Sequence, residues 1–505
     1  MKMKNFLLRE ISRRETKFKI SRFAKHGEAR QNSSGALPMI VLLFGSLAVI
    51  ILTGFIIWAD ANLRVARRSY NRAQAFRIAE AGIDYYRWHL AHASADYEDG
   101  TGGPGPYVHD YYDRTGEIIG QFSLDITPPL IGSSVVTVRS TGKVNVDLTI
   151  EKIVEVKLAK PSFAKYSVLT NAPAIRFGAG TEVFGSIHSN GGIRFDGLAH
   201  NLVTSALTSY NDPDHSGDNE FAVHTHVSPQ DPLPPNSVPV RDDVFQVGRQ
   251  FPVPAVDFAG LTQNLADIKT QAQASGFYSG ASGAQGYEII FKTDDTFDLY
   301  RVNSLVSSPS SNCTNSQYQA TDQSGWGTWS VNSRTLLGNY PIPQNGLVFL
   351  EDNVWTGGQI DSARVTVASG RFPDNPSTRS NITVNENLLY TNYDGTDTIS
   401  LIAQNNLNIG MVSTTTLRID GAILAQNGRV GRYYYNSYCS PYHIRNIITS
   451  YGMIGTSQRY GFAYTNGTGY QTRNLIYDSN LLYAPPPSFP LTSDNYEQIF
   501  WNEIK

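Results

Sequence analysis

The chain has 505 residues, which is enough for two or three domains. Its 41 Lys and Arg nearly balance its 44 Asp and Glu, so no basic excess indicates a nucleic-acid partner. Beyond residue 60 the chain is poor in Lys and rich in Gly, Ser, Thr, Asn and Tyr, which is typical of an extracellular β protein.

Residues 1–35 form a basic leader with ten Lys and Arg against three Glu. By the positive-inside rule this leader stays in the cytoplasm and residues 60–505 are exported. Arginines just beyond the next stretch, such as Arg64 and Arg67, weaken this bias without cancelling it. The leader is long for a secretory signal and no Ala-x-Ala site follows closely, so a cleaved signal peptide is not expected.

Residues 36–59 carry no charged side chain and are almost entirely apolar. As a helix these 24 residues are about 36 Å long, a little more than the ~30 Å hydrocarbon core of a bilayer, which predicts a single membrane-spanning segment in contact with lipid. A buried core helix is the alternative, but core helices are seldom apolar on every face for this length. An apolar stripe with spacings of three and four continues the helix to about Ala95. The stripe comprises Leu63, Ala66, Tyr70, Ala73, Phe76, Ala79, Ile83, Tyr86 and Leu90.

Alternating strands follow in residues 107–160, with a hairpin turn predicted at Thr141-Gly142. We expect a small antiparallel sheet that packs on the apolar stripe of the helix. Such a sheet supplies the hydrophobic partner that the stripe needs.

The pattern changes after residue 162, where short strands alternate with Gly and Asn turns. Ala174–Phe177 recurs in part as Gly192–Phe195, and Leu401–Asn405 returns as Ile423–Asn427. This loose period near twenty residues predicts a right-handed parallel β-helix, a solenoid, over 162–209 and 346–445. A β-sandwich or jelly roll is the alternative.

The remaining segments are assigned around this solenoid. Residues 210–345 are predicted as an insertion or side lobe, with a helix over 257–275 capped by Asp257 and a hairpin over 287–302. Residues 446–505 are predicted as a C-terminal cap and tail. The fold class is thus mainly β with one long N-terminal transmembrane helix.

The leader, the Gly35-Ala36 junction, the uncharged stretch and the extended helix together resemble a type IV pilin. Ala75–Asp84 resembles more narrowly the N-terminal region of PilX-type minor pilins and related pseudopilins. The resemblance covers about residues 30–95. It implies cleavage after Gly35 by a prepilin peptidase and methylation of Ala36. It also implies packing of the helix among other pilin-like subunits, so the apolar stripe could serve filament packing as well as sheet packing. Ile40 stands where most pilins have a Glu. Tip subunits often lack this Glu as well, so the resemblance implies an initiating or capping subunit.

Two candidate sites come from individual residues. His215, His224 and His226 lie in one polar segment, and His-Thr-His on a strand points both imidazoles to one face, as a metal site requires. A hydrogen-bonded polar loop is the alternative. Cys313 and Cys439 could pair in an oxidising compartment, or remain two separate buried thiols.

No catalytic motif appears, and the acids Glu182, Asp196, Asp361 and Asp420 form no repeated pair. We therefore expect no enzyme and no cofactor. A dense set of tyrosines between Tyr433 and Tyr470 could form a surface platform, where aromatic side chains bind glycans or proteins. Packing in the core or on the sides of the solenoid is the alternative, and it is favoured for any single tyrosine. The leading hypothesis is an exported, pilin-like surface protein that acts in a filament or in adhesion. A membrane-tethered carbohydrate-active enzyme and a signal-anchored envelope protein outside any filament are the alternatives.

Overall fold

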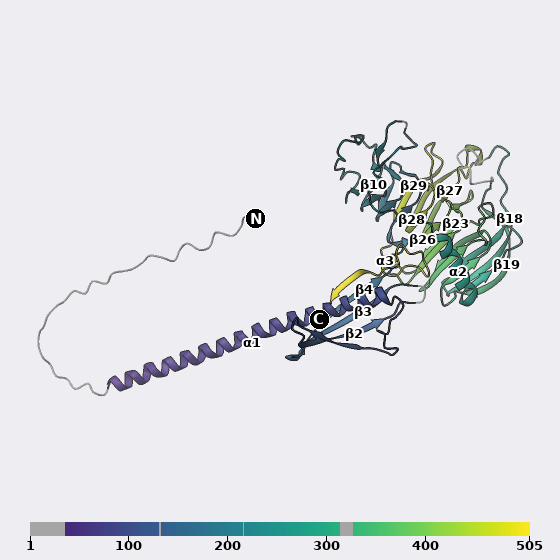
Figure 1. The fold of residues 1–505 in the computed structure, drawn as a ribbon. Coiled ribbons are helices and arrows are strands. Elements are labelled where there is room, and N and C mark those ends of the chain that lie inside the picture. The colour runs from purple at the N-terminus through teal and green to yellow at the C-terminus, as the bar shows by residue number, and fades with distance from the viewer. Residues whose placement is uncertain (1–35, 131–132, 216, 314–326, 505) are drawn as a thin grey trace. The chain divides into compact units, whose positions relative to one another are not determined.

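The computed structural model describes residues 36–130, 133–215, 217–313 and 327–504, so the leader and Gly35 lie outside the described residues. The described chain is mainly β, with one long N-terminal helix (Figure 1). This helix, α1 (Ala36–His92), ends at His92 rather than at Ala95. Residues up to Tyr70 and residues from Asn71 onward form two compact units.

A five-stranded antiparallel sheet follows α1 in the second unit. Its strands, in spatial order, are β1 (Tyr107–Tyr112), β2 (Ile118–Thr127), β3 (Val136–Val144), β4 (Asp147–Ala159) and β30 (Glu497–Glu503). The edge strand β30 comes from the C-terminal end of the chain, and its Trp501 lies opposite Val156 of β4. The prediction of a plain C-terminal tail is therefore wrong for these residues, which the sheet needs to pair the outer edge of β4.

The last turns of α1 pack on this sheet (Figure 1). Of the predicted stripe, Ala79, Ile83, Tyr86 and Leu90 are buried and Phe76 is half-buried. The earlier members of the stripe, from Leu63 to Ala73, are exposed. Two further helix residues, Ala75 and Ile78, are fully buried in the same core. The contact with the sheet thus begins at Ala75, so only the later part of the predicted stripe packs on the sheet.

The turn predicted at Thr141–Gly142 is also misplaced, because β3 runs straight through it and turns at Asn145–Val146. Gly142 serves instead to let the helix approach the sheet. A β-carbon at Gly142 would lie 2.1 Å from the carbonyl oxygen of Ala75 and 2.4 Å from the backbone nitrogen of Ala79. Glycine within a strand often marks such a close backbone approach.

Replacing Gly142 with Ala should therefore lower the free energy of unfolding by about 1–3 kcal/mol, as overpacking of a filled core does. Thermal unfolding of the purified full-length protein in detergent measures the loss. Gly103 is the matched control, because a β-carbon there meets nothing within 4 Å. Equal stabilities of Gly142→Ala and Gly103→Ala would contradict the close helix–sheet contact.

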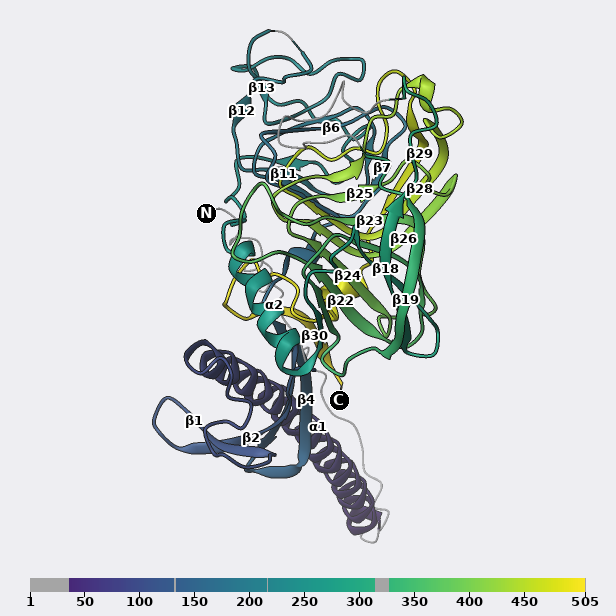
Figure 2. The same ribbon diagram turned by 90° about the vertical axis from the view of Figure 1, so that its right-hand side faces the viewer.

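The rest of the chain forms mostly parallel strands joined in a 20-stranded sheet (Figure 2). One ladder of parallel pairs runs through this sheet from end to end. Its strands in spatial order are β15 (Arg249–Gln250), β11 (Val203–Ser205), β8 (Ile187–Ser189), β5 (Val168–Thr170), β28 (Ile444–Thr456), β26 (Thr416–Ala425), β24 (Thr398–Ala403), β22 (Arg364–Ser369), β20 (Leu347–Leu350) and β16 (Phe277–Ser279).

Two more parallel ladders flank the first, and one of them includes the first halves of β26 and β28. One joins β10 (Leu198–Ala199), β7 (Glu182–Phe184), β29 (Gly469–Ile476), β28 and β26. The other joins β17 (Gly286–Phe291), β21 (Val354–Ile360), β23 (Ile382–Tyr390), β25 (Leu407–Ile409) and β27 (Val430–Arg432). A separate parallel sheet holds β6 (Ala174–Phe177), β9 (Gly192–Phe195) and β14 (Val223–His224).

Apolar side chains at matching register positions stack along the first ladder. They are Phe277, Val348, Val367, Leu401, Ile423, Ile454, Val168, Ile187 and Val203. All but Phe277 are buried. The repeats seen in the sequence are confirmed as stacked strands, because Ile175 lies opposite Ile193 and Leu401 lies opposite Ile423.

Asparagine side chains form a second kind of stack at the turns. The Asn381 backbone N–H donates to Oδ1 of Asn353 at 3.0 Å, and the Asn406 N–H donates to Oδ1 of Asn381 at 3.1 Å. The Arg429 N–H continues the series to Oδ1 of Asn406 at 2.9 Å. Each amide thus satisfies a backbone donor that the turn leaves without a strand partner.

The pairings correct two predicted segments. Within 210–345, β15, β16 and β17 belong to the ladders, so this segment is not a separate insertion. The predicted hairpin is confirmed there, since β17 pairs antiparallel with β18 (Thr296–Leu305), which pairs in turn with β19 (Val331–Pro341). In the predicted cap, β28 lies between β26 and β5 in the middle of the first ladder. The position of β28 late in the sequence suggested a cap at the end of the ladder. The chain, however, enters the ladder at β5 and later returns to pair β28 with that strand.

Helix α2 (Leu261–Ser275) lies along the first ladder (Figure 2). Its apolar residues Leu265 and Ile268 pack against Phe349 and Ala368. Its N-cap is Gly260 rather than the predicted Asp257, whose carboxylate accepts the Ala259 N–H at 2.7 Å in the turn before the helix.

Candidate functional site

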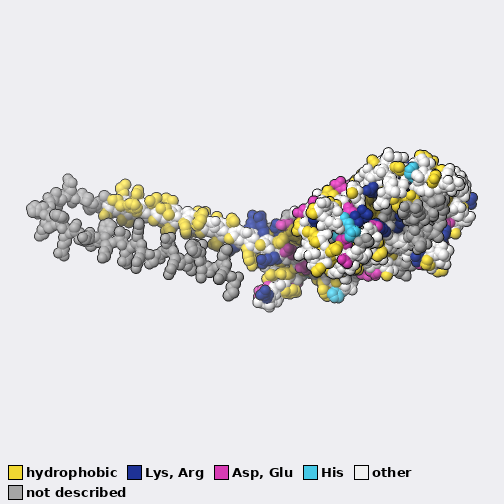
Figure 3. Space-filling view, turned by 90° about the horizontal axis from the view of Figure 1, so that it is seen from above, with side chains coloured by type: hydrophobic (Ala, Val, Ile, Leu, Met, Phe, Trp, Pro, Cys, Tyr) yellow, Lys and Arg dark blue, Asp and Glu magenta, His cyan; other side chains and the backbone are white. Residues whose placement is uncertain are grey.

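The first part of α1 is the largest exposed apolar surface of the described chain. Its large apolar side chains from Leu37 to Trp58 are each at least 48% exposed. Figure 3 shows hydrophobic side chains along this part of the helix. By length and composition the helix can cross a membrane. Because soluble proteins rarely leave such a patch uncovered, the segment is suited to lipid or to apolar neighbours.

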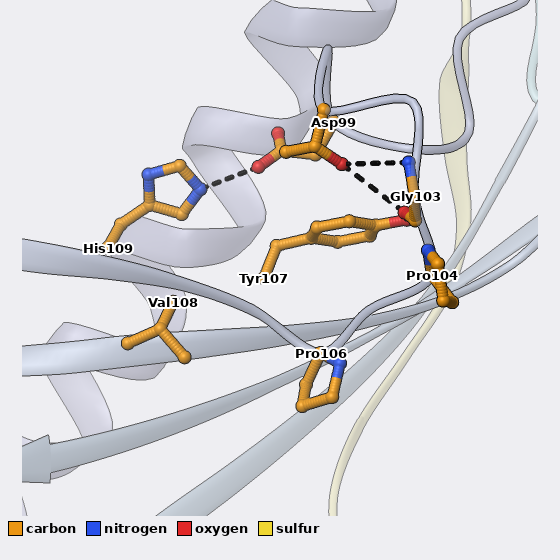
Figure 4. A pocket seen from close by; sticks show the side chains of 8 residues that line it. Asp99, Gly103, Pro104, Pro106, Tyr107, Val108 and His109 are labelled. Atoms are coloured by element: carbon orange, nitrogen blue, oxygen red, sulfur yellow. Dashed lines mark hydrogen bonds and ion pairs between the residues drawn. The ribbon is translucent and has the colours of Figure 1, made fainter.

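A shallow pocket of about 430 Å³ lies where the turn after α1 meets β1 (Figure 4). His109 Nε2 lies 2.7 Å from Oδ2 of Asp99, and the Tyr107 hydroxyl donates to the Gly103 carbonyl at 2.8 Å. These polar groups of the pocket are thus paired with one another, whereas Oδ1 of Asp99 has no hydrogen-bond partner among the described residues. The pocket therefore supports the turn after the helix and offers no obvious reactive group.

A second pocket, of about 170 Å³, lies over β17, β21 and β23. Glu288 and Glu386 both line it, with Trp355 between their strands. Glu386 lies where the register between β21 and β23 shifts, and such irregularities are frequent beside functional sites. Burial raises the pKa of the Glu288 carboxyl, although its ion pair with Arg334 opposes the rise. Neither glutamate was singled out from the sequence, because no short motif links residues a hundred positions apart.

The four acids considered from the sequence do not converge. Glu182 pairs with His200 at 2.6 Å, and Asp196 pairs with Arg194 at 2.8 Å. Asp361 accepts from the Asn392 amide at 2.8 Å, and Asp420 accepts from Arg418 at 2.8 Å. Each carboxylate is thus held in a local contact of its own.

The three predicted histidines do come together, and two acids join them. Asp212 and His215 lie in the connection between β12 (Ser209–Tyr210) and β13 (Glu220–Phe221), which pair antiparallel. Glu220 begins β13, His224 ends β14, and His226 follows two residues later. The cluster is thus built from two strands and two connecting segments, all beside β9.

Gly192 of β9 leaves the space in which the β12–β13 hairpin packs. A β-carbon at Gly192 would lie 2.2 Å from the ring of Tyr210, so only glycine leaves room for that ring. The Tyr210 ring in turn lies 5.5 Å from the ring of His224. The hairpin that carries Glu220 is therefore held directly against the strand that pairs with β14.

Glu220 is the centre of the cluster and is only 1% exposed. Its Oε1 lies 3.1 Å from Nε2 of His226, in hydrogen-bond contact. His215 Nδ1 lies 2.9 Å from the same oxygen without making a hydrogen bond to it. Oε2 of Glu220 has no hydrogen-bond partner among the described residues.

His224 is fully buried on the other side of Glu220. Its Nδ1 lies 3.1 Å from the Phe221 carbonyl, which can only accept, so Nδ1 carries a proton. Its Nε2 faces Oδ2 of Asp212 at 3.6 Å and Oε2 of Glu220 at 3.8 Å. Burial lowers the pKa of the His224 imidazole and so favours its neutral form.

The tyrosines near the C-terminal end mostly pack inside the stack and form no surface platform, so the packing alternative holds for most of them. Tyr433, Tyr434, Tyr435 and Tyr470 are buried, whereas Tyr438 is 62% exposed. Their hydroxyls and rings surround buried arginines. The guanidinium of Arg432, for example, lies 4.8 Å from the Tyr435 ring, and burial lowers its pKa to about 10. Tyrosine supplies both apolar surface and a polar group, which explains its density inside the stack.

Cys313 and Cys439 form a disulfide that closes a sequence separation of 126 residues. Both are buried with Met411, Tyr433 and Tyr435. Of the two possibilities that the sequence left open, the structure has the paired form.

Replacing Cys313 and Cys439 together with Ser should lower the free energy of unfolding by about 3–5 kcal/mol, because the unfolded chain regains the freedom of a long closed loop. Urea unfolding followed by tryptophan fluorescence measures this loss. Dithiothreitol should reproduce it in the wild type. A further effect of dithiothreitol on the double variant would show that the bond is not the cause.

Comparisons with known proteins leave the family open. No family model matches the sequence, and no curated protein matches it. Among solved structures, the crystal structure of the competence-associated pilin ComZ from Thermus thermophilus is similar at a TM-score of 0.29 and 11% identity. The alignment covers 86% of this chain and 98% of that one. A TM-score of 0.29 lies below the level that indicates a shared fold.

Proposed function

We propose that this chain is a membrane-anchored, exported, pilin-like surface protein, and more narrowly a minor or tip subunit of a type IV pilus-like filament. The observation that carries this proposal is the two-part character of α1. Its first part is uncharged and exposed, and its last turns hold an antiparallel sheet through Ala75, Ala79 and Ile83. A helix of this kind can leave lipid and pack among like subunits without losing its outer domain.

The anchoring proposal includes an orientation and a processing step. The basic leader remains cytoplasmic and the residues after the helix are exported, in accord with the excess of Lys and Arg before Ala36. A prepilin peptidase cleaves after Gly35. Ile40 in place of the usual Glu suits an initiating or capping position, where fewer neighbouring N-termini need a carboxylate partner.

The β part is proposed to wind as a right-handed parallel β-helix that displays a binding face to a glycan or to another surface protein. The parallel ladders, their apolar stack and the Asn353–Asn381–Asn406 series support this winding. A rigid stack of this kind presents side chains at regular intervals, and such a binding face requires no catalytic group. We therefore propose display rather than catalysis as its role.

Mass spectrometry of protein purified from its own cells tests the processing step. The expected product begins at Ala36 and carries an N-terminal methyl group. Gly35→Leu should keep the leader because a prepilin peptidase requires the small residue before the cut. Wild-type protein that retains residues 1–35 would contradict the pilin proposal and favour a signal-anchored envelope protein.

A membrane-tethered carbohydrate-active enzyme is a second candidate, favoured by Glu288 and Glu386 in one pocket. Two carboxylates in unlike environments are what acid–base cleavage of a glycosidic bond needs. Here Glu288 is half-buried beside Arg334 and Glu386 is exposed.

This candidate predicts that purified protein releases reducing ends from at least one member of a panel of soluble polysaccharides. Glu288→Gln and Glu386→Gln should each lower that rate by more than about 100-fold. Glu182→Gln, an exposed glutamate paired with His200, is the matched control and should retain the rate. No cleavage, or cleavage that survives both pocket substitutions, would remove the enzyme as a candidate.

A further inference from the structure

We propose that Glu220, His224 and His226, together with Asp212 and His215, bind one divalent transition-metal ion of the zinc class. Such a site goes beyond anchoring and display, and it does not depend on either. It would fasten the β12–β13 hairpin to β9 and β14.

Donor spacing is the first observation. In one group the donor atoms of Asp212, His224 and His226 all lie within 4.8 Å of one another, and in a second those of His215, Glu220 and His226 do so. A tetrahedral zinc ion with bonds of about 2.0–2.1 Å places its donors about 3.3 Å apart. The neighbouring donor pairs around Glu220 lie 2.9, 3.1 and 3.8 Å apart, which brackets that value.

Unpaired buried atoms are the second observation. Oδ2 of Asp212, Oε2 of Glu220 and Nε2 of His224 have no hydrogen-bond partner among the described residues. All three residues are at most 3% exposed. Leaving such groups unpaired is costly, and one cation placed between them would satisfy all three at once.

The tautomer of His224 fits the same conclusion. Because its Nδ1–H donates to the Phe221 carbonyl, the lone pair of Nε2 points at the two carboxylates. A backbone carbonyl that holds the second ring nitrogen is the usual arrangement behind a metal-bound histidine. A lone pair aimed at carboxylate oxygens is repelled unless a proton or a metal ion lies between them.

Among the described residues, the ion-pair contacts of the Glu220 carboxylate are with histidines. Among the described residues no Lys or Arg lies within ion-pair distance of Glu220. Arg194 reaches Asp212 at 3.6 Å but is held closer by Asp196, at 2.8 Å. A mixed set of imidazoles and carboxylates favours zinc and its neighbours over magnesium or calcium, which take oxygen donors. His215, whose side chain is 39% exposed, marks the side from which an ion can enter.

The test uses full-length protein in detergent, treated with EDTA and then titrated with zinc against a chromophoric chelator. We expect one equivalent of bound zinc and a higher unfolding temperature when zinc is present. Cobalt should give the visible absorption of a four- or five-coordinate site, which is stronger than that of an octahedral ion. Wild-type protein that binds no zinc at micromolar concentrations would overturn the proposal.

Variants separate this site from adventitious binding. His224→Ala and Glu220→Gln should each weaken zinc binding by more than about 100-fold and abolish the cobalt spectrum. Glu220→Gln retains the volume of the side chain, so it remains informative if His224→Ala fails to fold. His200→Ala is the matched control, because His200 pairs with Glu182 outside the cluster. Zinc binding that persists in both cluster variants, or is lost equally in His200→Ala, would place the ion elsewhere and overturn the assignment.

Discussion

The contact of α1 with the antiparallel sheet is the constraint on which the parallel-stranded region depends, because both ends of that region join the sheet. The chain leaves β4 at Ala159, and it returns to pair β30 with the same strand. The two connections also bond to each other, since the Phe163 N–H donates to the Pro490 carbonyl at 2.9 Å and the Thr492 N–H donates to the Pro161 carbonyl at 2.7 Å. A change that weakens the packing of the sheet on α1 therefore affects both connections, through β4 and through β30, between this sheet and the parallel ladders.

The order of strands adds a second constraint. The chain enters the first ladder at β5, builds outward to β15, and then begins again at β16 on the far end. The later strands approach in sequence until β28 pairs with β5, Ile454 opposite Val168. Residues almost three hundred positions apart must therefore meet before the ladder is continuous, and the entropy of closing so long a loop delays this step. Once it is closed, each strand is stabilised chiefly by its two neighbours.

The elements that could be predicted from the sequence are those set by local patterning. The uncharged stretch after Ala36, the hairpin of β17 with β18, and the stacked repeats of Ile175 with Ile193 all follow from spacing over a few residues. The errors share a different cause. Gly142 was predicted as a turn residue because the sequence does not show that the backbone of α1 packs against it. The segment of β28 was predicted as a cap because the sequence does not show that it pairs with β5. The sequence left open whether the tyrosines around Arg432 are buried or exposed, because it does not reveal which polar residues the stack encloses.

The candidate sites show the same division. The spacing of His224 and His226 is visible in the sequence, but the central position of Glu220 depends on the β12–β13 hairpin, for which Gly192 leaves room beside β9. The two pocket glutamates meet only because β17 and β23 flank β21, and because the register slips between Thr356 and Gly358. Both sites thus arise where a connection or a bulge departs from the regular stack. A regular parallel stack satisfies its own backbone and buries its own apolar side chains, so polar groups become available for binding mainly where that regularity is broken.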